Sequence, residues 1–196
     1  MKLTANHLYH IYNQGNNKQN IFQDDNDYIC FLKKIREELL PNCNILAYCL
    51  MPNHFHFLVD ITEKSVEKIK LGSIEIDKVS NAFRKILSSY AGYFNQKYEK
   101  TGSLFRQKTK GKCLTLDKSH NYSLICLNYI HQNPYKANLI LNSEFWKYSS
   151  YIDYLGVRNG TLCDFNLAYQ YLDINKIKIE DGINLNLEDE DIKHIF

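Results

Sequence analysis

Two histidines stand one residue apart in the apolar segment LMPNHFHFLVD, residues 50–60. Side chains two positions apart in a β-strand point to the same side, so His54 and His56 would lie about 7 Å apart at their Cα atoms. That spacing suits two ligands of one divalent ion, whereas Phe55, Phe57 and Val59 would fill the opposite face. The alternative is a pair of packed or hydrogen-bonded histidines, because a buried imidazole without a partner costs about 1 to 3 kcal/mol.

A second group of polar residues lies in LICLNYIHQNPYKANLI, residues 124–140. On a helix, Tyr129 and Asn133 are four positions apart and share one face, so a phenol and an amide oxygen could enter one site. Asparagine offers a hard oxygen ligand, and tyrosine becomes a nucleophile when a nearby cation favours the phenolate. His131, two positions from Tyr129, would point away and is expected to be structural, with assistance in proton transfer as the alternative. The alternative for Tyr129 is packing in the core, as one of 15 tyrosines.

The net charge of +2 conceals a strong asymmetry along the chain. Residues 81–114 carry eight basic side chains against Glu99 alone, and residues 161–196 carry three lysines against eight acids. A basic middle is typical of a domain that binds a polyanion, although the lysines could merely solvate a helix face. The residues expected to contact nucleic-acid phosphates are Arg84, Lys85, Arg106, Lys108, Lys110 and Lys112. Tyr90, Tyr93 or Phe105 could stack on bases, but the helical spacing of Tyr90 and Tyr93 favours a core position.

The length of 196 residues, with 44% hydrophobic and 23% charged residues, fits one globular domain with a short appendage. No apolar run approaches the roughly 18 to 20 residues that a membrane helix needs, and the N-terminus lacks the apolar region of a signal peptide. The expected location is therefore the cytoplasm. Six cysteines without a CxxC pair indicate reduced thiols.

The residue pattern predicts the elements that must position these side chains. Aromatic alternation predicts a strand over residues 7–15, and helical periodicity predicts a helix over 24–40. Residues 43–51 and 54–61, separated by Pro52-Asn53, predict an antiparallel hairpin in the middle of a sheet. The remaining expectations are a helix over 66–98 that Gly72-Ser73 could interrupt, a strand over 103–116, and a helix over 120–132 capped by Asp117 or Ser119 and ending before Pro134. The order β α β β α β α indicates an α+β fold, an antiparallel β-sheet with helices packed on it.

Four segments in order carry a resemblance to a known family. MPNHFHFLV resembles the histidine-hydrophobic-histidine (HUH) motif of the single-tyrosine transposases, and NYIHQNPYKANLI is similar to the tyrosine helix of their REP-associated tyrosine transposase branch. YHIYNQGNNKQNIF and YFNQKYEKTGSLFRQKTKGK also resemble that branch, so the likeness spans about residues 9–151. It implies a ferredoxin-like (RRM-like) HUH catalytic domain over residues 1–155. Residues 156–196 form an acidic C-terminal extension without a counterpart.

The resemblance implies a metal-dependent single-stranded DNA endonuclease and strand transferase that acts on hairpin-containing DNA. His54 and His56 would hold Mg²⁺ or Mn²⁺, with Asn133 completing the ligand set, or Gln132 in its place. Tyr129 would attack the scissile phosphate and leave a covalent 5′-phosphotyrosine and a free 3′-hydroxyl. The expected partner is single-stranded DNA with a REP-like or insertion-end hairpin, and no association with a membrane is expected. The protein is expected in the cytoplasm, associated with the nucleoid.

Some alternatives remain open from the sequence. The resemblance implies either a monomer or a homodimer. A domesticated protein of the same fold could bind nucleic acid without cleaving it, and an occluding C-terminal tail would produce the same behaviour. A metal-dependent hydrolase could use His54 and His56 with a bound water as nucleophile, without a covalent intermediate.

Overall fold

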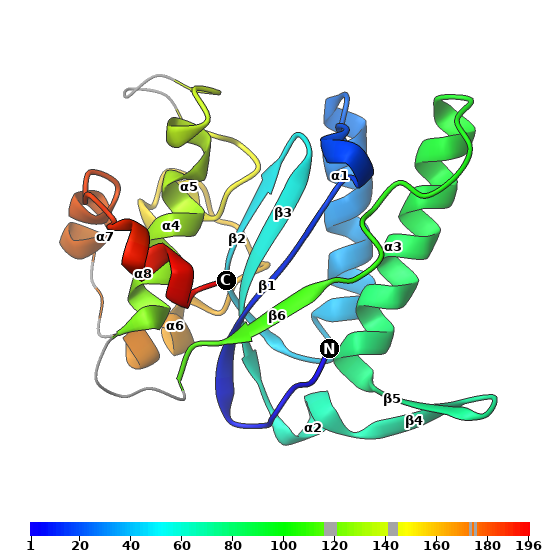
Figure 1. Cartoon of the computed structure of the whole chain (residues 1–196). Coiled ribbons are helices and arrows are strands. Elements are labelled where there is room, and N and C mark those ends of the chain that lie inside the picture. Colours follow the sequence, from blue (N-terminus) through cyan, green and yellow to red (C-terminus); the bar gives the residue numbers. More distant parts are fainter. Residues whose placement is uncertain (116–120, 141–144, 173, 175) are drawn as a thin grey trace.

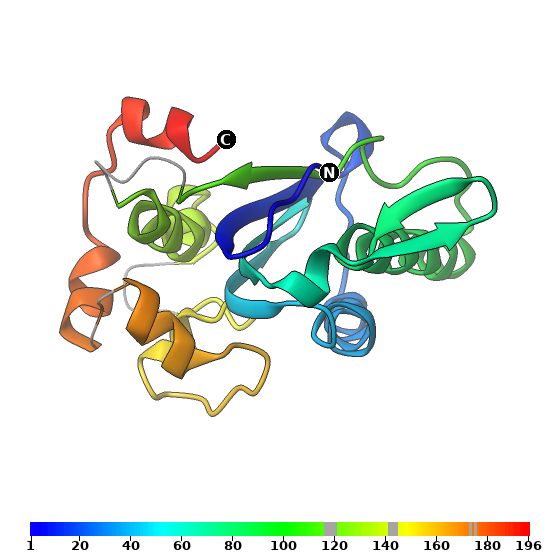
Figure 2. The same cartoon turned by 90° about the horizontal axis from the view of Figure 1, so that it is seen from below.

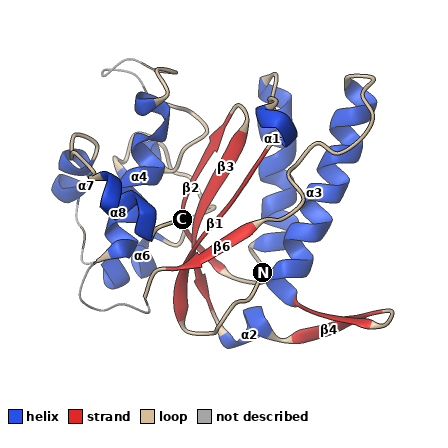
Figure 3. Cartoon of the chain, viewed as in Figure 1, coloured by secondary structure: helices blue, strands red, loops and turns tan. Residues whose placement is uncertain are grey.

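A four-stranded antiparallel sheet with the order β2-β3-β1-β6 forms the centre of the protein (Figure 3). The computed structural model describes residues 1–115, 121–140, 145–172, 174 and 176–196. The strands are β1 (His7–Gln14), β2 (Asn44–Met51), β3 (His54–Ile61) and β6 (Lys110–Cys113). The predicted hairpin of β2 and β3 is confirmed, with β3 inside the sheet, but β2 is an edge strand rather than a central one.

Helices cover both faces of this sheet (Figures 1 and 2). One face carries α1 (Asp25–Lys34), which continues into the π-helical turn η2 (Ile35–Leu39), and the long helix α3 (Lys78–Lys97). The other face carries α4 (Tyr122–Lys136) and the helices of the C-terminal part, α5 (Tyr151–Tyr154), α6 (Phe165–Leu172), α7 (Lys176–Gly182) and α8 (Asp189–His194). The predicted α+β class is confirmed. The described residues also form two short helices, η1 (Asn16–Lys18) and α2 (Glu63–Val66).

The alternation of β3 assigns its side chains to the two layers. Phe55, Phe57 and Val59 are fully buried in the core beneath α1 and α3, as their spacing predicts. His56 and Leu58 face the α4 layer, where Leu58 joins the second core cluster. The strand is therefore buried on both sides, and its histidines need partners within the α4 layer.

Side-chain caps start the three longest helices. The Asp24 carboxylate accepts from the backbone N–H of Asp27, and the Asp27 carboxylate accepts from the backbone N–H of Asp24. These two bonds form a capping box at the start of α1. Asp77 caps α3, and Asn121 caps α4 by accepting from Leu124 N–H. The predicted caps Asp117 and Ser119 lie outside the described residues.

The end of α4 differs from the expectation that Pro134 stops it. The helix runs on to Lys136, with Pro134 in its last turn. A proline this near the C-terminal end removes one intrahelical bond, and Ala137 N–H still reaches the Asn133 carbonyl at 3.0 Å. Asn133 is therefore inside the helix, one turn after Tyr129.

Two other predicted segments also differ. Residues before α3 form a hairpin of β4 (Lys68–Leu71) and β5 (Ile74–Asp77), not a helical arm, because KIKL and IEID alternate with period two around Gly72 at φ +60°. Of the strand expected over 103–116, the described residues form a continuous strand only from Lys110 to Cys113, and Phe105 makes an isolated bridge to Gly15. Leu104 and Phe105 are buried in the core.

The part of the chain after residue 155 packs against α4 and the sheet. Ala168, Leu172, Ile179 and Ile195 are buried in the same cluster as the inner face of α4. The chain ends beside β1, between the sheet and α8 (Figure 1). Tyr90 and Phe105 are buried, which confirms the core position expected for Tyr90 and excludes base stacking by either ring in this conformation. No helix among the described residues is long and apolar enough to cross a membrane.

Candidate active site

The four residues predicted to carry chemistry meet between β3 and α4. The His54 and His56 rings lie 4.9 Å apart by their centroids, and the Tyr129 ring stands edge-on to His56 at 5.5 Å. Asn133 Oδ1 is 3.4 Å from His54 Nε2. Their convergence follows from two local periods, two residues on the strand and four on the helix.

Hydrogen bonds indicate where the protons of this group lie. His54 Nδ1 is 2.5 Å from Asn53 Oδ1, an atom that can only accept, so Nδ1 carries the proton and Nε2 carries a lone pair. Asn133 donates its amide to the Tyr129 carbonyl at 3.4 Å, which turns Oδ1 toward His54. His56 Nε2 is buried and has no hydrogen-bond partner among the described residues. The group thus offers a lone pair on His54 Nε2 beside the Asn133 amide oxygen and an unpartnered Nε2 on His56, a donor set that fits a bound cation.

Burial sets the protonation of the same groups. Desolvation lowers the pKa of His54 below its usual value, and lowers the pKa of His56 further, with the neighbouring His10 adding to the effect. Desolvation also raises the pKa of Tyr129, opposed by its contact with Asn133. The imidazoles are therefore neutral and able to act as ligands at neutral pH, while the phenol keeps its proton.

Within the part of the chain that the structure describes, no group of three His, Cys, Asp or Glu side chains could hold a metal ion. Two imidazoles and the Asn133 amide oxygen are the set that this site offers. Imidazole suits borderline ions and amide oxygen suits harder ones, so the combination fits Mn²⁺ better than Mg²⁺.

A cavity of about 360 Å³ opens in front of these residues. His54, His56 and Tyr129 line it together with Tyr12, and the ring of Phe196 forms part of its wall. Asn13 and Gln14 also line it, together with three cations: Arg106, Lys108 and Lys110. The site is thus a concave, positively charged space with a phenol and two neutral imidazoles in its wall.

The structure separates the six predicted phosphate-binding residues. Arg106 and Lys108 border both this cavity and a groove of about 710 Å³, which Arg84 also lines from α3. Lys110 borders the cavity only. Lys85 forms an ion pair with Glu38 at 3.0 Å, and Lys112 lines neither space, so these two are not brought to the site.

Sequence reasoning missed three residues of the site. His10 and Tyr12 come from β1, where Tyr12 pairs directly with His56, and they repeat the i, i+2 spacing that drew attention to the two histidines of β3. That shared spacing was a usable signal. Phe196 contacts the Tyr129 ring at 5.2 Å, and no pattern in the sequence connects the last residue with the site.

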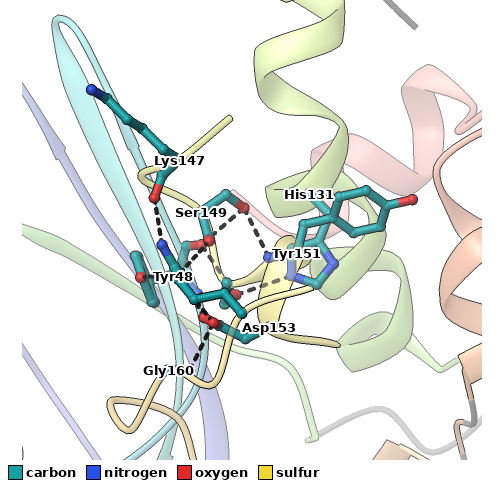
Figure 4. A network of polar contacts seen from close by, with 9 residues as sticks. Tyr48, His131, Lys147, Ser149, Tyr151, Asp153 and Gly160 are labelled. Carbon is teal, nitrogen blue, oxygen red and sulfur yellow. Dashed lines mark hydrogen bonds and ion pairs between the residues drawn. The ribbon is translucent and has the colours of Figure 1, made fainter. Parts of the chain in front are cut away.

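The neighbours of Tyr129 on α4 have other partners. His131 points away from the cavity and contacts Ser150 Oγ at 3.0 Å, within the polar network that holds the 145–160 segment against β2 (Figure 4). Gln132 donates to the carbonyls of Gly182 and Leu185, at 2.7 and 2.9 Å. The expectation for His131 is confirmed, and Asn133, not Gln132, lies against His54.

No family model and no curated protein matches the sequence. Among solved structures, the chain is similar to a REP-associated tyrosine transposase bound to a REP hairpin, with a TM-score of 0.53 and 15% sequence identity. The likeness covers 84% of this chain and 92% of the other. The two chains share a fold. The shared fold agrees with the α+β class predicted from the sequence, and the local geometry remains the source of the residue roles.

Proposed function

We propose that the protein is a metal-dependent single-stranded DNA endonuclease and strand transferase that works through a covalent 5′-phosphotyrosine. One observation carries the proposal: Tyr129, His54 and His56 line one cavity together with three cations, and the amide oxygen of Asn133 lies 3.4 Å from His54 Nε2. The shared fold with a transposase supports it.

The residues of the chain divide the work. His54, His56 and Asn133 would hold the ion, Mg²⁺ or Mn²⁺, which when bound supplies positive charge to a non-bridging phosphate oxygen. Arg106, Lys108 and Lys110 would bind the DNA backbone.

Tyr129 performs the covalent step. Its Oη forms a bond to the scissile phosphorus as the bond to the 3′ oxygen breaks, which leaves a 5′-phosphotyrosine and a 3′-hydroxyl. The proton lost from the phenol is balanced by the proton that the departing 3′ oxygen takes up. Attack by a 3′-hydroxyl reverses the step and joins strands, so the reaction needs no external energy source.

The groove along α3 gives a path for the rest of the substrate. Arg84, Arg106 and Lys108 line it, and the last two also border the cavity, so a strand lying in the groove leads to Tyr129. The solved neighbour is bound to a REP hairpin. We infer that this chain likewise binds a hairpin, with the flanking single strand entering the cavity.

The test uses a hairpin oligonucleotide with labelled single-stranded flanks, incubated with the full-length protein and Mn²⁺. The expected product is a denaturant-stable protein–DNA adduct that Tyr129→Phe abolishes while DNA binding persists. Tyr12 is the other phenol that lines the cavity, so Tyr12→Phe is the matched control and should leave the adduct intact. Peptide mapping of the adduct identifies which of the two tyrosines carries the DNA. An undiminished adduct in Tyr129→Phe would refute the assignment of the nucleophile.

A non-cleaving nucleic-acid-binding protein of this fold is the second candidate, and the Phe196 ring in the cavity favours it. The same assay separates the two, because an inert binder retains the hairpin and forms no adduct at any metal concentration. A hydrolase that uses a bound water as nucleophile would cleave the DNA without forming an adduct, and Tyr129→Phe would leave its cleavage rate nearly unchanged.

A further inference from the structure

A chain of two hydrogen bonds connects His56 to the C-terminal segment. His10 Nε2 lies 2.8 Å from His56 Nδ1, and His10 Nδ1 lies 2.7 Å from the carbonyl oxygen of Ile195. The two rings are stacked, with centroids 5.0 Å apart, and both histidines are buried. His10 is not among the residues that the proposed reaction uses.

The chain admits one proton arrangement for neutral rings. The Ile195 carbonyl can only accept, so His10 Nδ1 must donate to it. His10 Nε2 then carries a lone pair and accepts from His56 Nδ1. This leaves His56 Nε2 without a proton, and it is the buried atom with no hydrogen-bond partner among the described residues.

The opposite arrangement is strongly disfavoured. A proton on His56 Nε2 would require His10 to donate through Nε2, which would leave the His10 Nδ1 lone pair facing the Ile195 carbonyl lone pairs at 2.7 Å. Two acceptors at that distance in a buried site repel each other. The backbone carbonyl therefore determines the tautomer of an imidazole that it does not touch.

We propose that His10 is a positioning residue for His56: it fixes the tautomer and ring orientation that turn Nε2 toward the metal, with Ile195 as the outer anchor. This rests on the proposed function, because the ligand role of His56 is part of it. Ligand histidines are ordinarily held through their other ring nitrogen in this way. His54 has its own anchor in the adjacent Asn53, so the two ligands are oriented independently.

The proposal makes the C-terminal segment a component of the site. Ile195 is fully buried in the cluster beneath α4, so its carbonyl is held by packing rather than by the site itself. The role of His10 thus depends on a contact across 185 residues of sequence.

The first measurement reads the tautomers directly, without metal or DNA. Two-bond ¹H–¹⁵N correlation spectra of the ¹⁵N-labelled full-length protein are expected to show protonated Nδ1 and unprotonated Nε2 for both His10 and His56. A protonated Nε2 on His56 would overturn the proposal.

The second measurement is calorimetric titration with Mn²⁺ alone. His10→Phe removes the acceptor and is expected to weaken Mn²⁺ affinity by about 10- to 100-fold. His10→Gln can place an amide oxygen near the former Nε2 and is expected to restore most of the affinity. His131→Phe, which removes a buried imidazole on the far side of α4, is the matched control and is expected to leave Mn²⁺ affinity unchanged.

The outcomes separate this inference from the proposed function. Equal Mn²⁺ affinity in the wild-type protein and a folded His10→Phe overturns the positioning role and leaves the nuclease proposal standing. Failure of the wild-type protein to bind Mn²⁺ overturns the metal site, and this role of His10 with it. Weakened affinity in His10→Phe with rescue by His10→Gln supports the inference even if no adduct forms.

Discussion

Substitution of Phe196 by alanine is expected to accelerate formation of the covalent adduct. Its ring contacts four aromatic rings of the site edge-on, at centroid distances of 4.8 Å to Tyr12, 5.1 Å to His10, 5.2 Å to Tyr129 and 6.0 Å to His56. A phosphate that approaches Tyr129 through the cavity must displace this ring.

The magnitude follows from those contacts. Edge-to-face aromatic pairs contribute about 0.5 to 1.5 kcal/mol each beyond their burial, and the low end applies to a ring that is 39% exposed. Four such contacts hold the ring with about 2 kcal/mol, which reduces the open fraction of the site about 30-fold. Phe196→Ala removes that term, so the single-turnover rate should rise by about 10- to 30-fold.

The assay is the rate of adduct formation under single-turnover conditions with saturating Mn²⁺ and the hairpin oligonucleotide. Phe145→Ala is the matched control, since Phe145 is another half-exposed phenylalanine on the α4 side that does not line the cavity. It should leave the rate unchanged. An unchanged or lower rate in a folded Phe196→Ala protein with normal Mn²⁺ affinity would refute the occlusion.

Three further expectations concern ligand identity, DNA binding and stability. Asn133→Ala should weaken Mn²⁺ affinity in calorimetric titration by about 10-fold or more and leave the unfolding free energy nearly unchanged. Gln132→Ala should lower the unfolding free energy measured in urea and leave Mn²⁺ affinity unchanged, because it removes two hydrogen bonds to backbone carbonyls. The opposite pattern would contradict the assignment of Asn133 as the ligand. Lys108→Ala should reduce the slope of log Kd against log salt by about one, measured by fluorescence anisotropy, while Lys85→Ala, which breaks an ion pair with Glu38, should not. Burial lowers the pKa of His131 to about 3, so the unfolded state binds a proton below about pH 6.5 and the native state does not. His131 alone should therefore lower the unfolding free energy by roughly 1 kcal/mol per pH unit from pH 6.5 toward 3, in addition to the effect of the other buried histidines, and His131→Phe should remove this part of the decline in urea titrations.

The sequence predicted the parts of this protein that short-range periodicity controls. The two-residue period of β3 brought His54 and His56 to one face, and the four-residue period of α4 aligned Tyr129 with Asn133. The sequence-based prediction was wrong at the end of α4 and in the segment before α3. Pro134 was expected to end a helix that continues to Lys136. Residues 68–77 were predicted as part of a helix, although their apolar residues alternate with period two.

Long-range contacts explain what remained hidden. His10 and Tyr12 enter the site because β1 is the neighbour of β3, a pairing that the order of elements does not specify. Ile195 and Phe196 enter because helices after residue 155 complete the core on the α4 face. The acidic character of the last 36 residues does not reveal how this segment packs, whereas its scattered apolar positions, such as Leu172 and Ile179, are buried and anchor it.

Consecutive residues at the end of the chain act on the site in opposite directions. The Phe196 side chain lines the cavity against the Tyr129 ring, where we expect it to obstruct the substrate, whereas the backbone carbonyl of Ile195 is expected to fix the proton arrangement through His10. One effect belongs to a side chain and the other to the main chain, so Phe196→Ala removes the cover and keeps the anchor. Deleting the whole segment would remove both, and greater access would be offset by weaker Mn²⁺ binding. A truncated protein that cleaves poorly would therefore not exclude occlusion, and the point substitution is the sharper test of it.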